Sequence, residues 1–496
     1  MASLYGEGVD EVECIETHIS CLFLTDQYVY KLKKPIEFGF LDYSTLKKRR
    51  AACEDEIRLN RRLAPDVYLD VIPVGRDQHG CWKIGELAEV EDWLVRMRRL
   101  PADRCLVARL EARAWTTEDA SKIVAVLSAF YASLSPLSAP DYCDRYFQHI
   151  IDNREELLLA RHGLPIDRVQ SVLSAQLRFL FLNRDSIRSR VDQGRIVEGH
   201  GDLRAEHVYM TDPPVVIDGI EFSAELRTID TADELCFFAM TCDLLGASEL
   251  GNRVLREVCQ SLGDRPNDRL LNFYRTYRAC VRAKVAALRA QQTAAPGAAD
   301  DPVGAMRYLD LAADYAKGLG PCFALLVRGL SGTGKSTLAK QVADRSGAIH
   351  LSTDHLRKEL GAPHGSDAVA DYSETARRAV YESLLEKAIA HIRSGMSVIL
   401  DGTFQKAEIL HRTVERLRRE NLTVRVVTCV CSPEVALQRI SKRRQSETLS
   451  DADEAVYAQQ LISAERVPEE IAEIEIDTTQ AESQQVDQIR RLLCTE

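Results

Sequence analysis

The strongest chemical signal lies at residues 329–336, where Gly-Leu-Ser-Gly-Thr-Gly-Lys-Ser has the phosphate-loop spacing G-x-x-x-x-G-K-[ST]. An apolar run at 322–328 precedes the motif and a helical pattern follows it, which predicts a strand, a loop and a helix N-terminus. Lys335 would place its charge on the β- and γ-phosphates, and the Ser336 hydroxyl would ligate Mg²⁺. The residues predicted to hold ATP here are Gly329, Ser331, Gly332, Thr333, Gly334, Lys335, Ser336 and Thr337.

The residues beside this loop narrow the class of nucleotide-binding protein. The sequence contains no NKxD segment, which argues against a GTPase. The apolar run 398–401 ends in Asp401 and continues with Gly402, where ring-forming ATPases carry a Glu that activates water. Asp401 is therefore predicted to anchor Mg²⁺ beside the loop.

A second polar pair follows the apolar run 348–352. Asp354 and Arg357 lie three residues apart at the start of a predicted helix. Asp354 could accept the proton of an acceptor hydroxyl while Arg357 holds an anionic substrate, and a helix cap is the alternative role for Asp354. The basic run 439–444 is predicted to be a lid that brings Arg443 over the transferring phosphate, with a solvated helix face as the alternative.

These residues together resemble a known family. Residues 322–490 are similar to the small P-loop kinases classed with AAA-type domains, among them gluconate kinase, chloramphenicol phosphotransferase and polynucleotide kinase. The resemblance rests on the 329–336 loop, Asp354, Arg357, Asp401 and the 439–444 run. It implies ATP- and Mg²⁺-dependent transfer of the γ-phosphate to a hydroxyl.

The N-terminal half contains a separate pair of acidic residues. Asp202 lies in Gly-His-Gly-Asp-Leu-Arg-Ala-Glu-His207, and Asp218 ends the apolar run 215–217. Two such residues could hold one Asp as a base toward a hydroxyl and the other on Mg²⁺, although acidic turn residues are common. Glu221 is a further candidate metal or substrate ligand.

This segment resembles the catalytic loop H-G-D-L-x-x-x-N of the aminoglycoside phosphotransferases, which have a protein-kinase-like fold. The resemblance makes Asp202 the catalytic Asp, Asp218 the metal Asp, and His207 the residue at the position of the family's second metal ligand, an Asn. Because neutral imidazole is a poorer Mg²⁺ ligand than a carbonyl oxygen, this departure affects the metal site. The same resemblance makes Lys31 the phosphate-binding Lys and Glu56 its helical partner, with surface charge as the alternative. The preceding hairpin, 17–25, lacks the glycine of a kinase phosphate-covering loop.

The chain as a whole resembles a bacterial two-domain family in which an aminoglycoside-phosphotransferase-like half is fused to a P-loop kinase half. The predicted fold class is α/β and α+β, with a kinase-like N-terminal fold and a doubly wound parallel sheet at the C-terminus. The predicted divisions are a sheet-containing lobe at 1–100, a helical lobe with the catalytic-loop motif at 101–290, a linker at 291–302 and the P-loop domain at 303–496. Strands are predicted at 323–327, 348–352, 397–400 and 424–431, and a strand hairpin is predicted from 196–200, 207–210 and 215–218.

Composition sets limits on the remaining classes. The 496 residues carry a formal net charge of −11, and 45% of them are hydrophobic, which is ordinary for globular domains. An acidic chain does not coat nucleic acid non-specifically, so a nucleic-acid partner is not expected. No long apolar segment or signal peptide is found, and the 14 cysteines form no CxxC pair, so we expect a cytoplasmic protein without a membrane partner. The sequence leaves open a monomer or a homodimer.

The sequence predicts an ATP- and Mg²⁺-dependent phosphotransferase that acts on a hydroxyl of a small molecule. The C-terminal half would perform the transfer, and the N-terminal half would be either a second kinase or a regulatory ligand-binding module. The alternatives are a nucleotide-dependent regulatory switch or stress protein without a small-molecule acceptor, and a kinase of polynucleotide 5′-hydroxyls.

Overall fold

The structure is a computed structural model that describes residues 11–38, 41–85, 87–292, 302–359, 374–443 and 454–495. The chain divides into two compact units, each of which draws on two stretches of the sequence. The first unit comprises Met1–Tyr142 and Arg188–Ala279, and the second comprises Cys143–Ile187 and Cys280–Glu496. The predicted linker at 291–302 falls largely outside the described residues. In the described ranges, no helix combines the length and the apolar character needed to cross a bilayer.

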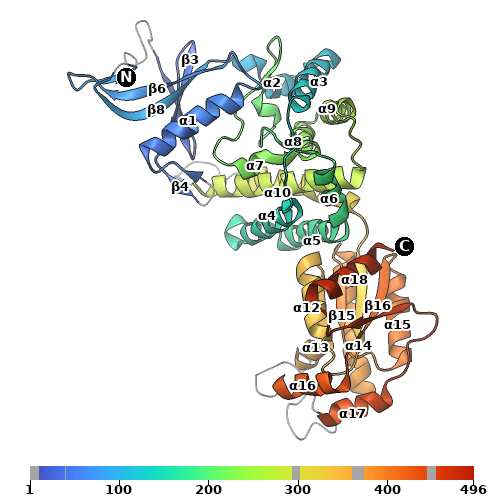
Figure 1. The fold of residues 1–496 in the computed structure, drawn as a ribbon. Helices are drawn as coiled ribbons and strands as arrows, with labels where there is room; N and C mark the ends of the chain where they lie inside the picture. The colour runs from blue at the N-terminus through green and yellow to red at the C-terminus, as the bar shows by residue number, and fades with distance from the viewer. Residues whose placement is uncertain are drawn as a thin grey trace. The chain divides into compact units, whose positions relative to one another are not determined.

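The first unit begins with a six-stranded antiparallel sheet in the order β1-β2-β3-β8-β6-β7. Its strands are β1 Glu13–Glu16, β2 Ser20–Leu24, β3 Tyr28–Lys33, β6 Tyr68–Arg76, β7 Trp82–Ile84 and β8 Glu89–Arg98, and a small ribbon is formed by β4 Glu37–Phe38 and β5 Leu41–Asp42. Helix α1, Leu46–Asn60, begins after Thr45, whose side chain accepts from the N–H of Lys48. Figure 1 shows α1 lying along β6 and β8, where its buried face packs on the sheet.

The rest of the first unit is mostly helical. Its helices are α2 Leu106–Glu111, α3 Thr117–Ala132, α7 Ala224–Arg227, α8 Thr231–Leu244 and α9 Ser248–Ser261, while α6 Arg184–Asp192 and α10 Asp268–Gln292 have residues in both units. Short strands β10, Val208–Tyr209, and β11, Val215–Val216, form the predicted hairpin.

The predicted place of the strand at 196–200 in that hairpin is wrong. The strand, β9 Ile196–Glu198, pairs instead with β12, Thr228–Asp230. Its chain leaves the strand at Gly199, because the next two N–H groups, of His200 and Gly201, donate to the buried carboxylate of Glu234. The carboxylate of Glu234 accepts the hydrogen bonds that the carbonyl groups of a paired strand would otherwise accept.

A buried ion-pair network in the first unit makes a test of its stability. Arg190 donates to both oxygens of Asp230 at 2.7 Å and to both oxygens of Asp264 at 2.6 Å, and all three side chains are buried. Arg190→Met is expected to lower the free energy of unfolding by about 3–5 kcal/mol, because it removes the cation that binds two buried carboxylates and leaves Asp264 with only the longer contact to Arg195, at 3.9 Å. Urea unfolding measures this change. Arg188→Met, an exposed position on the same helix, is the matched control, and an equal effect of both substitutions would contradict the prediction.

The second unit is built around a five-stranded, wholly parallel sheet in the order β14-β15-β13-β16-β17. The strands are β13 Phe323–Arg328, β14 Ile349–Ser352, β15 Val398–Asp401, β16 Thr423–Val430 and β17 Glu473–Asp477. Its helices are α4 Tyr142–Leu157, whose first residue belongs to the first unit, α5 Ile166–Leu182, α11 Pro302–Ala316, α12 Lys335–Ser346, α13 Thr353–Glu359, α14 Glu374–Arg393, α15 Ala407–Arg418, α16 Pro433–Arg443, α17 Glu454–Ser463 and α18 Glu482–Cys494. The predicted doubly wound parallel sheet is confirmed, and β17 is a strand that the sequence analysis did not predict.

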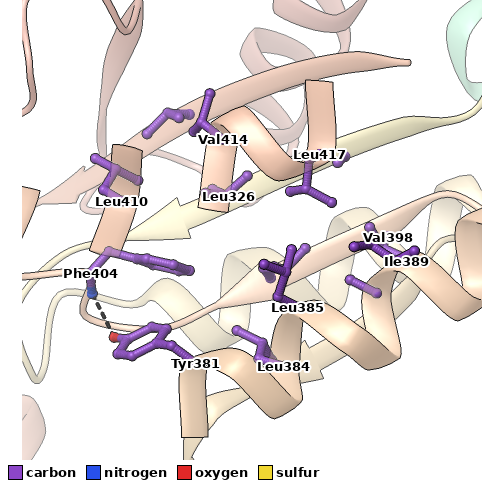
Figure 2. Packing of buried hydrophobic residues seen from close by; sticks show 14 of the residues in the cluster. Leu326, Tyr381, Leu384, Leu385, Ile389, Val398, Phe404, Leu410, Val414 and Leu417 are labelled. Atoms are coloured by element: carbon purple, nitrogen blue, oxygen red, sulfur yellow. Dashed lines mark hydrogen bonds between the residues drawn. The ribbon is translucent and has the colours of Figure 1, made fainter. Parts of the chain in front are cut away.

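Both faces of this sheet are buried, as the continuous apolar runs of its strands indicate. Leu326 and Leu400 face one cluster with residues of α14 and α15, whereas Leu325 and Ile399 face another with residues of α12 and α18. Figure 2 shows part of the first cluster, in which the Tyr381 hydroxyl accepts from the N–H of Phe404 at 2.9 Å. This bond holds the loop that follows Asp401.

Candidate functional site

The register of the second unit's sheet brings three predicted site segments to one edge. Asp401, the last residue of β15, lies opposite Val327 of β13 on one side and Ser352 of β14 on the other. In parallel strands the carboxyl ends share one edge, and ligands bind there. The phosphate loop, Asp401 and the start of α13 with Asp354 are therefore neighbours.

The phosphate loop has the backbone that its glycines predict. Gly332 has a φ of +79°, and a Cβ there would lie 2.5 Å from the carbonyl oxygen of Ala436. Only glycine allows so close an approach. Helix α12 is capped by Gly334, which has no side chain to bond the first-turn N–H groups. That helix end, with Ser336 and Thr337 exposed in its first turn, is suited to an anion.

Lys335 and Asp401 lie at the same end of the sheet as the phosphate loop. Lys335 Nζ donates to the carbonyl oxygen of Leu330 at 3.1 Å. Asp401 is buried and accepts from His350 Nε2 at 3.3 Å. Burial alone would raise the pKa of Asp401, but hydrogen bonds from His350 and Ser336 and the charge of Lys335 hold it below its usual value. A carboxylate and a hydroxyl are hard oxygen ligands, so Asp401 and Ser336 fit Mg²⁺.

Asp354 and Arg357 lie in the first two turns of α13. Their side chains approach to 3.6 Å, and each is about one third exposed. Ser352 Oγ accepts from the N–H of Asp354 at 3.3 Å, so Ser352 rather than Asp354 has the capping position. The Asp354 carboxylate is thus left facing Arg357 at the edge that carries the phosphate loop.

The predicted lid is described only in part. Arg439 of α16 donates to Thr478 Oγ1 and to the Thr478 carbonyl oxygen, both at 2.9 Å, and Thr478 Oγ1 donates to the Thr333 carbonyl oxygen at 2.7 Å. Arg439 therefore braces the phosphate loop. Arg443 is the last residue of α16, and its side chain, like residues 444–453, lies outside the described part of the chain.

Helix α17 contributes a contact for which the sequence carried no signal. Gln460 Oε1 accepts from the N–H of Ser331 at 2.8 Å, and Tyr457 belongs to a small apolar cluster against which Leu330 packs. The helix is therefore seated on the phosphate loop. The amide oxygen of Gln460 occupies a backbone donor that a phosphate oxygen could use.

Gln460→Ala is expected to tighten nucleotide binding at this loop by about two- to tenfold, because a phosphate would no longer displace a hydrogen bond of ordinary strength. The measurement is the Kd of a fluorescent ATP analogue at the phosphate loop. Binding at this loop is identified as the part of the signal that is lost in Lys335→Ala. Gln459→Ala, an exposed neighbour, is the matched control. Weaker binding by Gln460→Ala would show that this side chain supports the nucleotide.

In the first unit, the predicted Lys31, Glu56 and Asp218 are brought together. Lys31 Nζ donates to Glu56 Oε1 at 2.8 Å and to Asp218 Oδ1 at 2.9 Å. Burial alone would lower the pKa of Lys31, but Asp218 and Glu56 hold it well above its usual value. Lys31 in turn lowers the pKa of Asp218 far below its usual value. The surface-charge alternative for Lys31 and Glu56 is wrong, since both are buried.

A second buried lysine supports this cluster. Lys33 is fully buried, donates to Glu56 Oε2 at 2.6 Å and forms an ion pair with Glu221, which also accepts from the Tyr43 hydroxyl. Glu221, the further candidate metal or substrate ligand, is thus the buried partner of Lys33 and Tyr43, and its role as a ligand stays a prediction. Alternation along β3 places residues 31 and 33 on one face, a signal that could have found Lys33.

The loop around Asp218 is held from several sides. Asp218 has a left-handed backbone with a φ of +64°, and its N–H donates to the Tyr68 hydroxyl at 3.0 Å. The next N–H, of Gly219, donates to Asn60 Oδ1 at 2.7 Å. Strained backbone of this kind persists where the surroundings fix it, often at functional sites. The carboxylate of Asp218 is half exposed.

Asp202 and His207 are joined through Arg204, which the sequence analysis did not single out. The Arg204 guanidinium binds the Asp202 carboxylate through two hydrogen bonds, of 3.0 and 2.7 Å, and its Nη2 lies 3.0 Å from His207 Nε2. His207 Nε2 is also 3.7 Å from Asp218 Oδ2. The predicted catalytic residue Asp202 and the predicted metal ligands His207 and Asp218 thus lie in one cluster. The guanidinium of Arg204 is part of this cluster.

Comparison with known proteins finds a family model that matches part of the second unit. The family model described as an AAA domain matches residues 325–467. Among solved structures, a sugar kinase of Janibacter sp. HTCC2649 is 23% identical with a TM-score of 0.28 and covers 36% of this chain and 100% of its own. The Mycobacterium tuberculosis APS kinase in complex with AMPPNP and APS is 20% identical, with the same TM-score and coverage.

A comparison over most of the chain gives a stronger result. The uncharacterized protein Rv2004c of Mycobacterium tuberculosis (strain ATCC 25618 / H37Rv) is 32% identical over 407 residues, which are 79% of this chain and 78% of the mycobacterial protein. The shared length is greater than either unit alone, so the similarity includes residues of both. The chain therefore belongs to the same protein family as this uncharacterized mycobacterial protein.

Proposed function

We propose that the protein is an ATP- and Mg²⁺-dependent phosphotransferase whose second unit moves the γ-phosphate of ATP to a hydroxyl of a small molecule. The observation that carries this proposal is the strand register that gathers the phosphate loop, Asp401 and Asp354 at one sheet edge. A switch that only hydrolyses ATP needs no base directed at an acceptor, and the presence of Asp354 at the same sheet edge as Asp401 supports a transfer to an acceptor instead.

Each candidate residue of the second unit would have a separate role in such a transfer. Lys335 and the first-turn N–H groups of α12 would bind the phosphates, and Ser336 with Asp401 would hold Mg²⁺, which neutralises phosphate charge when bound. Asp354 would accept the proton of the acceptor hydroxyl as the new oxygen–phosphorus bond forms and the bond to ADP breaks. Arg357 would orient an anionic acceptor. Arg443, by analogy with the lids of P-loop kinases, is proposed to approach the transferring phosphate.

A screen of hydroxyl acceptors tests this proposal. Sugars, polyols, aminoglycosides, nucleosides and oligonucleotides with a 5′-hydroxyl are incubated with MgATP and the protein, and mass spectrometry detects an added phosphate. A phosphorylated small molecule, formed by the wild type and not by Lys335→Ala, is the expected result. ATP hydrolysis that no acceptor alters would favour the regulatory switch, and phosphorylated oligonucleotides would favour the polynucleotide kinase.

The first unit is proposed to bind a nucleoside polyphosphate in a protein-kinase-like site. The supporting observation is the buried Lys31, paired with a helical Glu56 and with Asp218 in a strained loop. A lysine held between two carboxylates at a partly exposed edge can exchange one of them for a phosphate. Lys31→Met in a Lys335→Ala chain is expected to abolish the remaining nucleotide binding, and Lys83→Met, which is exposed on β7, is the matched control.

A further inference from the structure

Kinase-like sites neutralise the nucleotide phosphates with divalent ions held by an Asp and an Asn. In the first unit, the resemblance to the aminoglycoside phosphotransferases makes Asp218 this Asp and puts His207 at the position of the Asn. The surroundings of His207 therefore decide whether this site holds a second metal ion. The residues within hydrogen-bond distance of its ring show what occupies that place.

The orientation of His207 fixes which ring nitrogen faces the site. Nδ1 lies 2.8 Å from the carbonyl oxygen of Asp202. Because a carbonyl oxygen only accepts, Nδ1 carries a hydrogen, and in the neutral ring Nε2 presents its lone pair. Nε2 is also the nitrogen nearest Asp218, at 3.7 Å from Oδ2. This lone pair is the one that a metal between His207 and Asp218 would need.

The lone pair is already used by Arg204. Arg204 Nη2 donates to His207 Nε2 at 3.0 Å and to Asp202 Oδ2 at 2.7 Å, while Nε donates to Asp202 Oδ1 at 3.0 Å. Nη1 pairs with Glu206. The Arg204 side chain is 6% exposed, so its position is set by packing as well as by these bonds. Guanidinium is always charged and has a rigid fork of donors.

We infer that the guanidinium of Arg204 takes the place of the second divalent ion, so that the first unit holds a nucleoside polyphosphate with a single metal ion at Asp218. A second ion between Asp202, His207 and Asp218 would meet a buried positive charge, would find the ring nitrogen already used, and would share each Asp202 oxygen with a hydrogen bond from Arg204. Asp218 keeps a half-exposed carboxylate that one ion can reach. This inference rests on the proposed nucleotide site of the first unit.

Counting bound Mn²⁺ tests the inference without measuring activity. The full chain carrying Lys335→Ala is saturated with a nonhydrolysable ATP analogue, and bound Mn²⁺ per chain is determined from the electron paramagnetic resonance of the free ion. Adding Asp218→Asn is expected to remove one ion. Adding Arg204→Ala together with His207→Asn is expected to add one ion, because the first substitution removes the guanidinium and the second supplies an amide oxygen as a ligand.

Two further variants separate charge from packing. Arg204→Lys keeps a cation and is expected to leave the count unchanged, and Arg58→Ala, exposed on α1, is the matched control. Thermal unfolding shows which variants are folded. If the double variant does not fold, the test rests on the number of Mn²⁺ ions that Asp218→Asn removes. Loss of one ion supports the single-ion inference, and loss of two ions overturns it.

The outcomes distinguish the two proposals. Equal Mn²⁺ counts for the parent and for a folded double variant, with nucleotide bound in both, would overturn the single-ion inference and leave the nucleotide site standing. If Asp218→Asn and Lys31→Met change neither nucleotide nor Mn²⁺ binding, the first unit has no nucleotide site, and both proposals fail.

Discussion

Lys335→Ala is expected to lower phosphoryl transfer from ATP by about 10²–10³-fold, because the ammonium group acts on charge that develops in the transition state. Lys335 starts α12 directly after the glycine-rich loop, and its Nζ donates to a backbone carbonyl, of Leu330, that a phosphate can replace. The measurement is the initial rate of ADP formation with Mg²⁺ and the acceptor found in the screen.

The control for this substitution lies on the same helix. Lys340→Ala removes an exposed lysine of α12 and is expected to leave the rate unchanged. Wild-type turnover by a folded Lys335→Ala protein would show that the second unit is not the source of the transfer. Asp202→Ala is then informative, because loss of that activity would assign the transfer to the first unit.

Asp354→Asn is expected to lower acceptor-dependent transfer by about 10²–10⁴-fold, the usual contribution of a positioned base. The amide has nearly the same shape and the Ser352 cap is untouched, so nucleotide binding should remain at the wild-type level. Rates with saturating acceptor and the Kd of a fluorescent ATP analogue measure the two effects separately.

A combined loss of rate and nucleotide binding would contradict the role of Asp354 as a base and indicate a structural role instead. Asp344→Asn, an exposed residue of α12, controls for the change of charge in the same unit. A transfer rate that is unchanged in Asp354→Asn would assign the base to another residue at the carboxyl edge of the sheet.

The features of the second unit that could be predicted are those formed by residues that lie close together in the sequence. The phosphate loop could be predicted because its glycines, lysine and serine follow one another and each has one backbone role. The positions of Asp401 and Asp354 could be predicted because each follows an apolar run, and parallel strands present their carboxyl ends together. Strand β17 was missed because three of its five residues, in Glu-Ile-Glu-Ile-Asp, are charged, unlike the more apolar runs of the other strands.

The sequence by itself determined the P-loop motif, the doubly wound sheet around it and the candidate groups Lys31, Glu56, Asp202 and Asp218. The tertiary structure alone decided what meets those groups: Gln460 reaches the phosphate loop from 129 residues away. It also decided that Lys33 pairs with Glu221, 188 residues later, and that Arg204 stands between Asp202 and His207. The physical reason is that side-chain partners at such separations depend on packing and charge balance, which spacing along the chain does not encode.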